Sequence, residues 1–201
     1  MAGILEHGHE VGHHTDLHRT PGTLSADEER RDFEHGLSTL TDLGATVRGF
    51  RAALWQATQS ALNAAAEFGM SYDSSLLHDD RPYAIEIGGR RLVELPVHWS
   101  LDDWEQYGYL PGPDIGRHVE TPDELRRLWN EELGAQRWAG GLCITTAHPF
   151  LSGRAARVEA LRRFVAEARA SGDVWIAPLG EIADRAAEVP TIAVRKPAGL
   201  T

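Results

Sequence analysis

Apolar residues recur at helical spacing in five segments of the chain, and local signals mark several of their ends. Ser25 and Glu28 form a capping box before the first segment, which closes at Gly44. The second segment closes at Gly69, since glycine readily adopts the left-handed conformation that ends a helix. Three of the five expected helices begin after Ser25, Thr58 and Thr121. The fourth includes 158–165, and the fifth spans 179–187.

Extended segments alternate with these helices. Two of them flank Gly88-Gly89, a typical hairpin signal. The expected extended segments are 45–51, 83–87, 91–96, 142–147 and 174–177. Alternation of this kind predicts an α/β fold with mostly parallel strands, and a closed or partial barrel and a doubly wound open sheet both fit it. We expect one domain over 1–190 and a loose tail over 191–201.

Composition and charge narrow the classes of function. The 201 residues are 42% hydrophobic, as in a single domain with a sizeable core. A net charge of −10 opposes a broad phosphate-binding surface, so no nucleic acid partner is expected. Cys143, the one cysteine, lies in an apolar run and is expected to be a small buried hydrophobe. The start lacks a secretory signal and no segment is apolar enough to span a membrane, which predicts a cytoplasmic protein without a membrane partner.

Five of the ten histidines lie between His7 and His18, a density typical of a metal site. Two arrangements compete. The segment from His9 to His13 matches the His-Glu-x-x-His pattern of zincin metalloproteases, with Glu10 as the base. His14 and His18 form a second pair that a helix would place on one face.

The zincin interpretation needs a stable helix through the first pair. Gly8 and Gly12 oppose that helix, because each glycine costs about 1 kcal/mol relative to alanine in a helix interior. A purely structural role, in which the imidazoles cap turns or face solvent, is a further alternative.

Spaced motifs along the chain resemble those of a known family. The segment from Gly8 to His18 carries its metal-binding histidines, and Ala147-His148-Pro149 carries its late histidine. The other matching segments are 49–55, 67–75, 79–83, 94–103, 153–154, 174–175 and 181–183. The chain therefore resembles the metal-dependent polysaccharide deacetylases, the NodB-like proteins of carbohydrate esterase family 4, in the subgroup of peptidoglycan deacetylases and allantoinase-like amidohydrolases. The resemblance implies a (β/α) barrel-like fold.

The same resemblance implies a hydrolase of C–N amide bonds. It would remove N-acetyl groups from an amino-sugar polymer such as peptidoglycan, or open a small cyclic amide. His14 and His18 would bind a divalent metal, expected to be zinc, with cobalt as a possible substitute. In the family's scheme His148 is the general acid and Arg51 tunes an acidic partner. Asp103 completes the catalytic set, with a carboxylate that orients His148.

Trp55, Trp99 and Asp102 are the expected substrate-binding residues. The two tryptophans would form an apolar wall around a sugar ring or another small substrate. Asp102, like Asp103, could instead orient His148. Core packing of the tryptophans, and plain solvation of the two carboxylates, are the structural alternatives.

Two departures from the family bear on activity. Arg51-Ala52-Ala53 stands where the family has Arg-x-Pro, and the chain shows no counterpart of the family's first, Asp-bearing strand. That strand supplies the base and the third metal ligand in the family, so we expect a poor hydrolase, with a degenerate deacetylase-like binding protein as the alternative. A barrel without its leading strand exposes an edge, which predicts a homo-oligomer.

Overall fold

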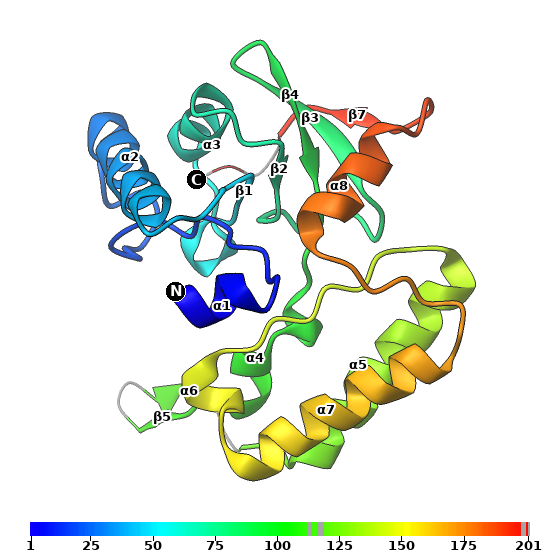
Figure 1. The fold of residues 1–201 in the computed structure, drawn as a ribbon. Helices are drawn as coiled ribbons and strands as arrows, with labels where there is room; N and C mark the ends of the chain where they lie inside the picture. Colours follow the sequence, from blue (N-terminus) through cyan, green and yellow to red (C-terminus); the bar gives the residue numbers. More distant parts are fainter. Residues whose placement is uncertain (112–113, 116–118, 198–199, 201) are drawn as a thin grey trace. The chain divides into compact units, whose positions relative to one another are not determined.

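The computed structural model describes residues 1–111, 114–115, 119–197 and 200. The chain folds into two compact units (Figure 1). Unit 1 comprises Met1–Pro96 and Ala177–Thr201, and unit 2 comprises Val97–Ile176. The single domain expected over 1–190 is thus built from two units, which are described separately below.

Unit 1 contains a sheet with the strand order β1-β2-β4-β3-β7. Neighbouring strands run parallel except β3 and β4, which form the expected antiparallel hairpin around Gly88-Gly89. The strands are β1 (Gly49–Phe50), β2 (Tyr72–Asp73), β3 (Tyr83–Ile87), β4 (Arg90–Glu94) and β7 (Val194–Arg195). A parallel-dominated sheet with helices between its strands confirms the α/β class.

The helices of unit 1 are α1 (Ala2–Glu6), α2 (Ala26–Asp42), α3 (Gln59–Glu67), α8 (Leu179–Ala187) and the 3₁₀ turn η1 (Ala53–Trp55). Ser25 and Glu28 form the expected capping box at the start of α2, and Thr58 caps α3. Helix α3 packs on β3 and β4, α2 packs on α3, and α8 packs on β4 (Figure 1). Their apolar faces and the sheet enclose a core that includes Phe33, Phe50, Leu62, Ile85 and Leu92.

Unit 2 is built around two long helices, α5 (Pro122–Ala139) and α7 (Ala155–Ala170), which pack on each other. Trp129 and Phe164 meet edge to face between them, with ring centroids 5.6 Å apart. Thr121 and Glu124 form the expected capping box of α5. The remaining elements are η2 (Trp99–Leu101), α4 (Asp103–Tyr107), α6 (Pro149–Ser152) and the hairpin strands β5 (Leu110–Pro111) and β6 (Asp114–Ile115).

Two expectations about extended segments are wrong. Segments 142–147 and 174–177 form no strand, because the first makes only an isolated bridge, from Thr146 to Asp102, and the second makes none. Within the tail expected over 191–201, Val194–Arg195 forms β7, which pairs in parallel with β3.

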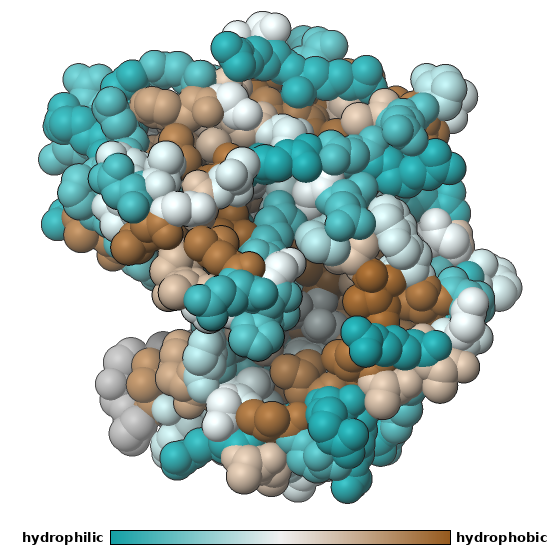
Figure 2. Space-filling model, viewed as in Figure 1, coloured by the Kyte–Doolittle hydropathy of each residue, from teal (hydrophilic) through white to brown (hydrophobic). Residues whose placement is uncertain are grey.

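On the face shown in Figure 2, hydrophilic side chains cover most of the unit that contains the sheet, and apolar residues occur in separate groups among them. Among the described residues, no helix is both long and apolar enough to cross a membrane.

Candidate functional site

The histidine-rich segment is not a helix. It runs as an irregular loop beside β1, joined to that strand by a parallel bridge between His13 and Phe50. The backbone N–H of His13 donates to the carbonyl of Gly49 at 2.8 Å, and the N–H of Arg51 donates to the carbonyl of His13 at 2.9 Å. The helical spacing expected for both histidine pairs is therefore wrong, and the sheet positions the loop instead.

His13 is a structural residue. Its ring is buried and stacks on Phe33, with centroids 4.2 Å apart. Nε2 donates to the carbonyl of Phe33 at 3.0 Å, and Nδ1 accepts from the backbone N–H of Thr15 at 3.1 Å. Burial lowers the pKa of His13, so the ring stays neutral with both nitrogens occupied. No lone pair remains for a metal.

Glu10 is also structural, which removes the zincin interpretation. Its Oε1 accepts from the hydroxyl of Tyr72 at 2.9 Å, and its Oε2 accepts from the backbone N–H of Gly180 at 2.8 Å. Burial raises the pKa of Tyr72, which keeps the hydroxyl protonated and able to donate. The carboxylate thus satisfies the first turn of α8, where a negative charge is favoured. A zincin needs Glu10 free and His13 as a ligand, and neither condition holds.

His14 and His18 lie side by side, with their rings edge to face and centroids 4.9 Å apart. Left-handed backbone at Thr15 (φ 62°) and His18 (φ 48°) brings them together. The N–H of His18 also donates to Oγ1 of Thr15 at 3.1 Å. Residues outside glycine adopt this conformation uncommonly, and such positions often cluster at functional sites.

The ring of His14 is oriented for ligation through Nε2. Its Nδ1 lies 2.7 Å from the carbonyl oxygen of Arg51, which can only accept, so Nδ1 carries the proton and Nε2 has the lone pair. A backbone carbonyl on the other nitrogen is typical of metal-binding histidines. Desolvation by burial lowers the pKa of His14 and outweighs the hydrogen bond to the carbonyl of Arg51, which raises it. The neutral ligand form is therefore favoured.

Residues of helix α2 contact the histidine-rich loop and fix its backbone. The carboxylate of Asp32 accepts the backbone N–H groups of Asp16 at 3.0 Å and Leu17 at 3.1 Å. Gly36 allows the close approach, because a Cβ there would lie 2.9 Å from Nε2 of His13 and 3.2 Å from the nitrogen of Asp16. The carboxylate of Asp16 accepts a hydrogen bond from Nδ1 of His35, at 2.9 Å.

Arg51 links the loop to the sheet. Its Nε donates to the carbonyl of Ser74 at 2.9 Å and its Nη2 donates to Oγ of Ser74 at 2.7 Å. The guanidinium also lies over the ring of Trp55, 5.9 Å from its centroid. Trp55 is buried, which agrees with the alternative of core packing, and its part in a substrate wall stays a prediction.

In unit 2, His148 and Asp103 form a hydrogen-bonded dyad. The bridge between Asp102 and Thr146 sets two extended segments in parallel, and α4 and α6 begin where these segments end. Nδ1 of His148 lies 2.6 Å from Oδ1 of Asp103, so it donates to the carboxylate. Asp103 is fully buried, whereas the side chain of His148 is 33% exposed. Within the described part of the chain, Nε2 of His148 makes no hydrogen bond, and it can exchange a proton.

The carboxylate of Asp103 is held by further donors. Oδ2 accepts from the backbone N–H of His148 at 2.9 Å and from the hydroxyl of Ser152. Asp102, expected to bind substrate, is buried and caps α4 through the N–H of Trp104 at 2.8 Å. These contacts give Asp102 a structural part, and its binding of substrate stays a prediction.

Potential metal ligands gather in threes at one place among the described residues, formed by Asp102, Asp103 and His148. Both oxygens of Asp103 and Nδ1 of His148 are engaged in hydrogen bonds, which favours a proton-transfer dyad over a cation site. His14 and His18 belong to no such trio in the ranges that the structure describes. They can supply two protein ligands of the three that catalytic zinc sites commonly have.

Aromatic side chains surround His148, and the sequence analysis did not single them out. Trp104 and Phe150 lie 6.2 Å and 5.4 Å from its ring, centroid to centroid. Phe150 is 67% exposed, and Trp99, an expected substrate residue, is 39% exposed. The only available signal was the position of Phe150 two residues after His148. Cys143 is half-buried. Burial raises the pKa of its thiol to about 11, so the thiol is not a nucleophile at neutral pH.

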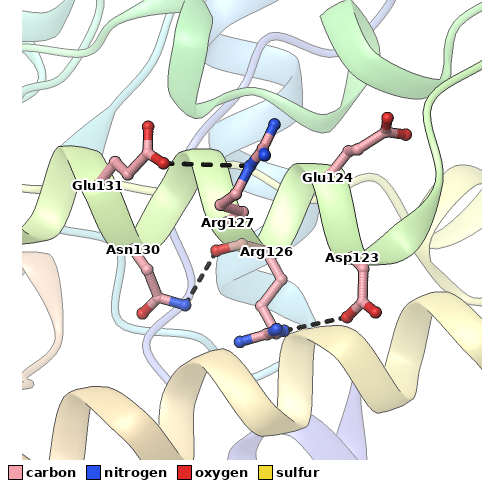
Figure 3. Close-up of a pocket in the computed structure, with 6 residues that line it drawn as sticks. All are labelled: Asp123, Glu124, Arg126, Arg127, Asn130 and Glu131. Atoms are coloured by element: carbon pink, nitrogen blue, oxygen red, sulfur yellow. Dashed lines mark hydrogen bonds and ion pairs between the residues drawn. The ribbon is translucent and has the colours of Figure 1, made fainter.

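A shallow hollow lies along α5 (Figure 3). The residues that line it are separate in the sequence from the histidines and aspartates described above. Arg126 pairs with Asp123 at 3.3 Å, and Arg127 pairs with Glu131 at 4.0 Å. Its lining contains no histidine, thiol or hydroxyl, and two of its three carboxylates, those of Asp123 and Glu131, are paired with arginines.

The comparisons with known proteins agree with this geometry. A solved structure from Mycobacterium smegmatis, assigned to the polysaccharide deacetylases, is 40% identical in sequence and has a TM-score of 0.89. The match covers 97% of this chain and 69% of that protein. The chain belongs to the polysaccharide deacetylase family. The family resemblance and the fold expected from the sequence motifs are thus confirmed, although no family model matches the chain.

Two less similar proteins resemble the chain, one in sequence and one in fold. A peptidoglycan deacetylase from Helicobacter pylori is 24% identical, over 77% of this chain and 62% of that enzyme. The solved structure of PuuE allantoinase is 21% identical, with a TM-score of 0.80 over 94% of this chain and 62% of that protein. The chain therefore spans less than two thirds of the length of either protein.

Proposed function

We propose that this chain is a metal-dependent amide hydrolase that removes N-acyl groups from an amino-sugar substrate. The observation that carries the proposal is the dyad of His148 and Asp103, with Nδ1 of the imidazole 2.6 Å from a fully buried carboxylate. A carboxylate that is bonded to one ring nitrogen fixes the tautomer and the orientation of the ring. In a chain that belongs to the polysaccharide deacetylases, such a dyad fits the general acid of amide cleavage.

His14 and His18 are the proposed metal ligands, with zinc as the expected ion and cobalt as a substitute. The donor set fits a divalent ion, because Nδ1 of His14 is held by the carbonyl of Arg51 and leaves Nε2 for ligation. When bound, a zinc ion lowers the pKa of its water and polarises the scissile carbonyl. The role of Arg51 follows from its contacts: it orients the His14 ring through its carbonyl, and its side chain is anchored on Ser74.

His148 acts on the departing nitrogen. With Nδ1 bonded to Asp103, the proton at Nε2 is the one available for transfer, and the amine leaves as the C–N bond breaks. Asp103 holds the imidazole in one orientation during that transfer. Asp103 is therefore a positioning residue, and His148 is the residue that touches the reacting atoms.

An amino sugar suits the surface around His148. Phe150 presents an exposed aromatic face beside His148, and Trp104 contacts both His148 and Phe150. Trp99 is a further proposed substrate-binding residue, because its side chain is also exposed. Aromatic rings stack on the apolar face of a sugar while its polar edge stays in water. A peptidoglycan glycan chain is the substrate that the Helicobacter enzyme suggests, and a small cyclic amide is the one that the allantoinase suggests.

The test measures acetate release from oligomers of N-acetylglucosamine and from peptidoglycan, and ring opening of allantoin, each with added zinc or cobalt. We expect acetate release that is lost in His148→Ala. If the chain opens the ring of allantoin and releases no acetate, its substrate is a cyclic amide and not an amino sugar. Equal turnover by the wild type and His148→Ala would exclude the proposed acid.

A ligand-binding protein without catalysis is the second candidate. It is favoured by the absence of a third acidic, histidine or cysteine side chain beside His14 and His18 among the described residues. In that case the chain binds oligomers of N-acetylglucosamine both with and without zinc, and it releases no acetate. Calorimetry on the N-acetylglucosamine oligomers, run beside the acetate assay, separates the two functions.

A further inference from the structure

Two acidic residues are buried together in the sheet of unit 1. Asp73 ends β2 and Glu94 ends β4, and the two are directly paired in the register of these parallel strands. Both are completely buried. Asp73 accepts hydrogen bonds from the backbone N–H of Ser75 at 3.1 Å and from its hydroxyl at 2.8 Å. Glu94 accepts one from the N–H of Leu76 at 3.0 Å through Oε1.

The second oxygen of Glu94, Oε2, is buried and has no hydrogen-bond partner in the described part of the chain. Two neighbouring carboxyl groups in an apolar interior do not both ionise, because each charge is desolvated and repels the other. Burial, followed by the charge of Asp73, raises the pKa of Glu94 well above its ordinary value. Burial also raises the pKa of Asp73. Glu94 is therefore the member that holds a proton at neutral pH.

The charged and titratable groups around the pair are few. Arg51 acts on Asp73 and lowers its pKa, in opposition to burial. Tyr83 on β3 faces Glu94, and burial, followed by Glu94, raises the pKa of the phenol. Arg195 of β7 lies over the ring of Tyr83 at 4.9 Å and bonds Asp79. None of these groups neutralises Glu94 directly.

The pair is connected to the proposed metal site by hydrogen bonds that meet at the peptide unit between Arg51 and Ala52. The hydroxyl of Ser75 donates to Asp73 and accepts the backbone N–H of Ala52 at 2.8 Å. The adjacent Ser74 holds both the Nε and Nη2 groups of Arg51. The carbonyl of Arg51 accepts the Nδ1 proton of His14 at 2.7 Å.

We propose that Asp73 and Glu94, sharing one proton, are positioning residues that fix the backbone of Arg51 and thereby the ring of His14. The inference rests on the proposed role of His14 as a ligand. The bonded serines transmit the position, since Ser75 cannot leave Ala52 without losing Asp73 as its acceptor. A second ionisation of the pair places two negative charges side by side and loosens segment 73–76, so His14 loses its fixed orientation as the pH rises.

The test uses Ser75→Ala, which cuts the link but leaves both acids, and Glu94→Gln, which keeps the shape but cannot ionise. Glu86→Gln, on the exposed face of β3, is the matched control. Zinc affinity is measured by competition with a chelator, the cobalt form by its visible absorption, and the His14 tautomer by ¹H–¹⁵N correlation of the imidazoles without metal.

Ser75→Ala should weaken zinc binding by about tenfold or more, as removal of a residue that orients a ligand usually does, and should broaden the His14 Nδ1–H signal. Glu94→Gln should keep the neutral-pH affinity and remove the alkaline loss of affinity that the wild type and Glu86→Gln show. Circular dichroism confirms that each variant is folded. If Ser75→Ala does not fold, the alkaline comparison of Glu94→Gln with the wild type decides alone.

An unchanged zinc affinity and His14 tautomer in folded Ser75→Ala would overturn the inference, as would an alkaline loss that persists in Glu94→Gln. His14→Ala separates this failure from that of the proposed function. If His14→Ala binds zinc like the wild type, the metal site itself is wrong. If His14→Ala loses zinc but Ser75→Ala and Glu94→Gln behave like the wild type, only the positioning role is wrong.

Discussion

Nδ1 of His148 donates to Oδ1 of Asp103 across 2.6 Å, although 45 positions separate the two residues in the sequence. The carboxylate is buried and also accepts from the backbone of His148 and the hydroxyl of Ser152. A side chain with this many fixed donors is held in one place, so the imidazole that it bonds has one orientation. This relationship sets the direction in which the free Nε2 of His148 faces.

Asp103→Asn should therefore lower kcat by about 10²-fold or more, within the range that positioned acid–base groups contribute, while KM changes little. An amide can present its NH₂ to Nδ1 and favour the wrong tautomer. Steady-state kinetics on the N-acetylglucosamine oligomers measure the effect, with Asp123→Asn on the exposed face of α5 as the control. Activity equal to that of the control variant would show that the dyad has no catalytic part.

Gly36→Ala should weaken metal binding without unfolding α2. The added methyl group would lie 2.9 Å from Nε2 of His13, so the histidine loop must shift to accommodate it. Gly134→Ala is the matched control, because it lies within α5 with nothing within 4 Å of the new Cβ. The control should gain up to about 1 kcal/mol of unfolding free energy from helix propensity and keep its zinc affinity. Equal zinc affinity in both variants would contradict the account of the loop.

Glu10→Gln distinguishes a deacetylase from a zincin. Glu10 accepts from Tyr72 and from the first turn of α8, so the variant should lose about 1–2 kcal/mol of unfolding free energy in urea titrations. Catalysis below the unfolding transition should persist. Complete loss of activity in a fully folded variant would instead give Glu10 a catalytic role.

The five longer helices, α2, α3, α5, α7 and α8, could be predicted from the sequence because their signals are local, whereas the short helices α1, α4 and α6 were not expected. Capping boxes at Ser25 and Thr121 mark true helix starts. The short strand β2 could not, because two residues carry no periodicity, and its place depends on pairing with β1 and β4. Segment 142–147 has the composition of a strand, but only Thr146 finds a partner.

The sequence predicted those residues of the candidate site that lie in motifs shared with the family. His14, His18 and His148 came from that resemblance, whereas the means by which they are oriented did not. The meeting of His14 and His18 depends on left-handed backbone at Thr15 and His18, which no helical spacing reveals. Nor does a sequence show that Trp55 and Asp102 are buried, since burial depends on residues distant in the chain.

Assembly is open to a direct measurement. Large apolar side chains are exposed in unit 2, including Trp138 at 91% and Trp175 at 57%, and surfaces of this kind often bind another chain. We expect light scattering coupled to size exclusion to give a mass above that of one 22.1 kDa chain. A monodisperse monomer over a range of concentrations would refute this prediction.

Metal dependence of acetate release tests the central claim most directly. The purified chain is stripped with a chelator, zinc or cobalt is titrated back, and release from N-acetylglucosamine oligomers is followed for the wild type, His14→Ala, His18→Ala and the exposed control His98→Ala. The account predicts that the metal restores release in the wild type and in His98→Ala, with little response in His14→Ala and His18→Ala. Release that needs no metal, or that the metal restores equally in all four proteins, would contradict it.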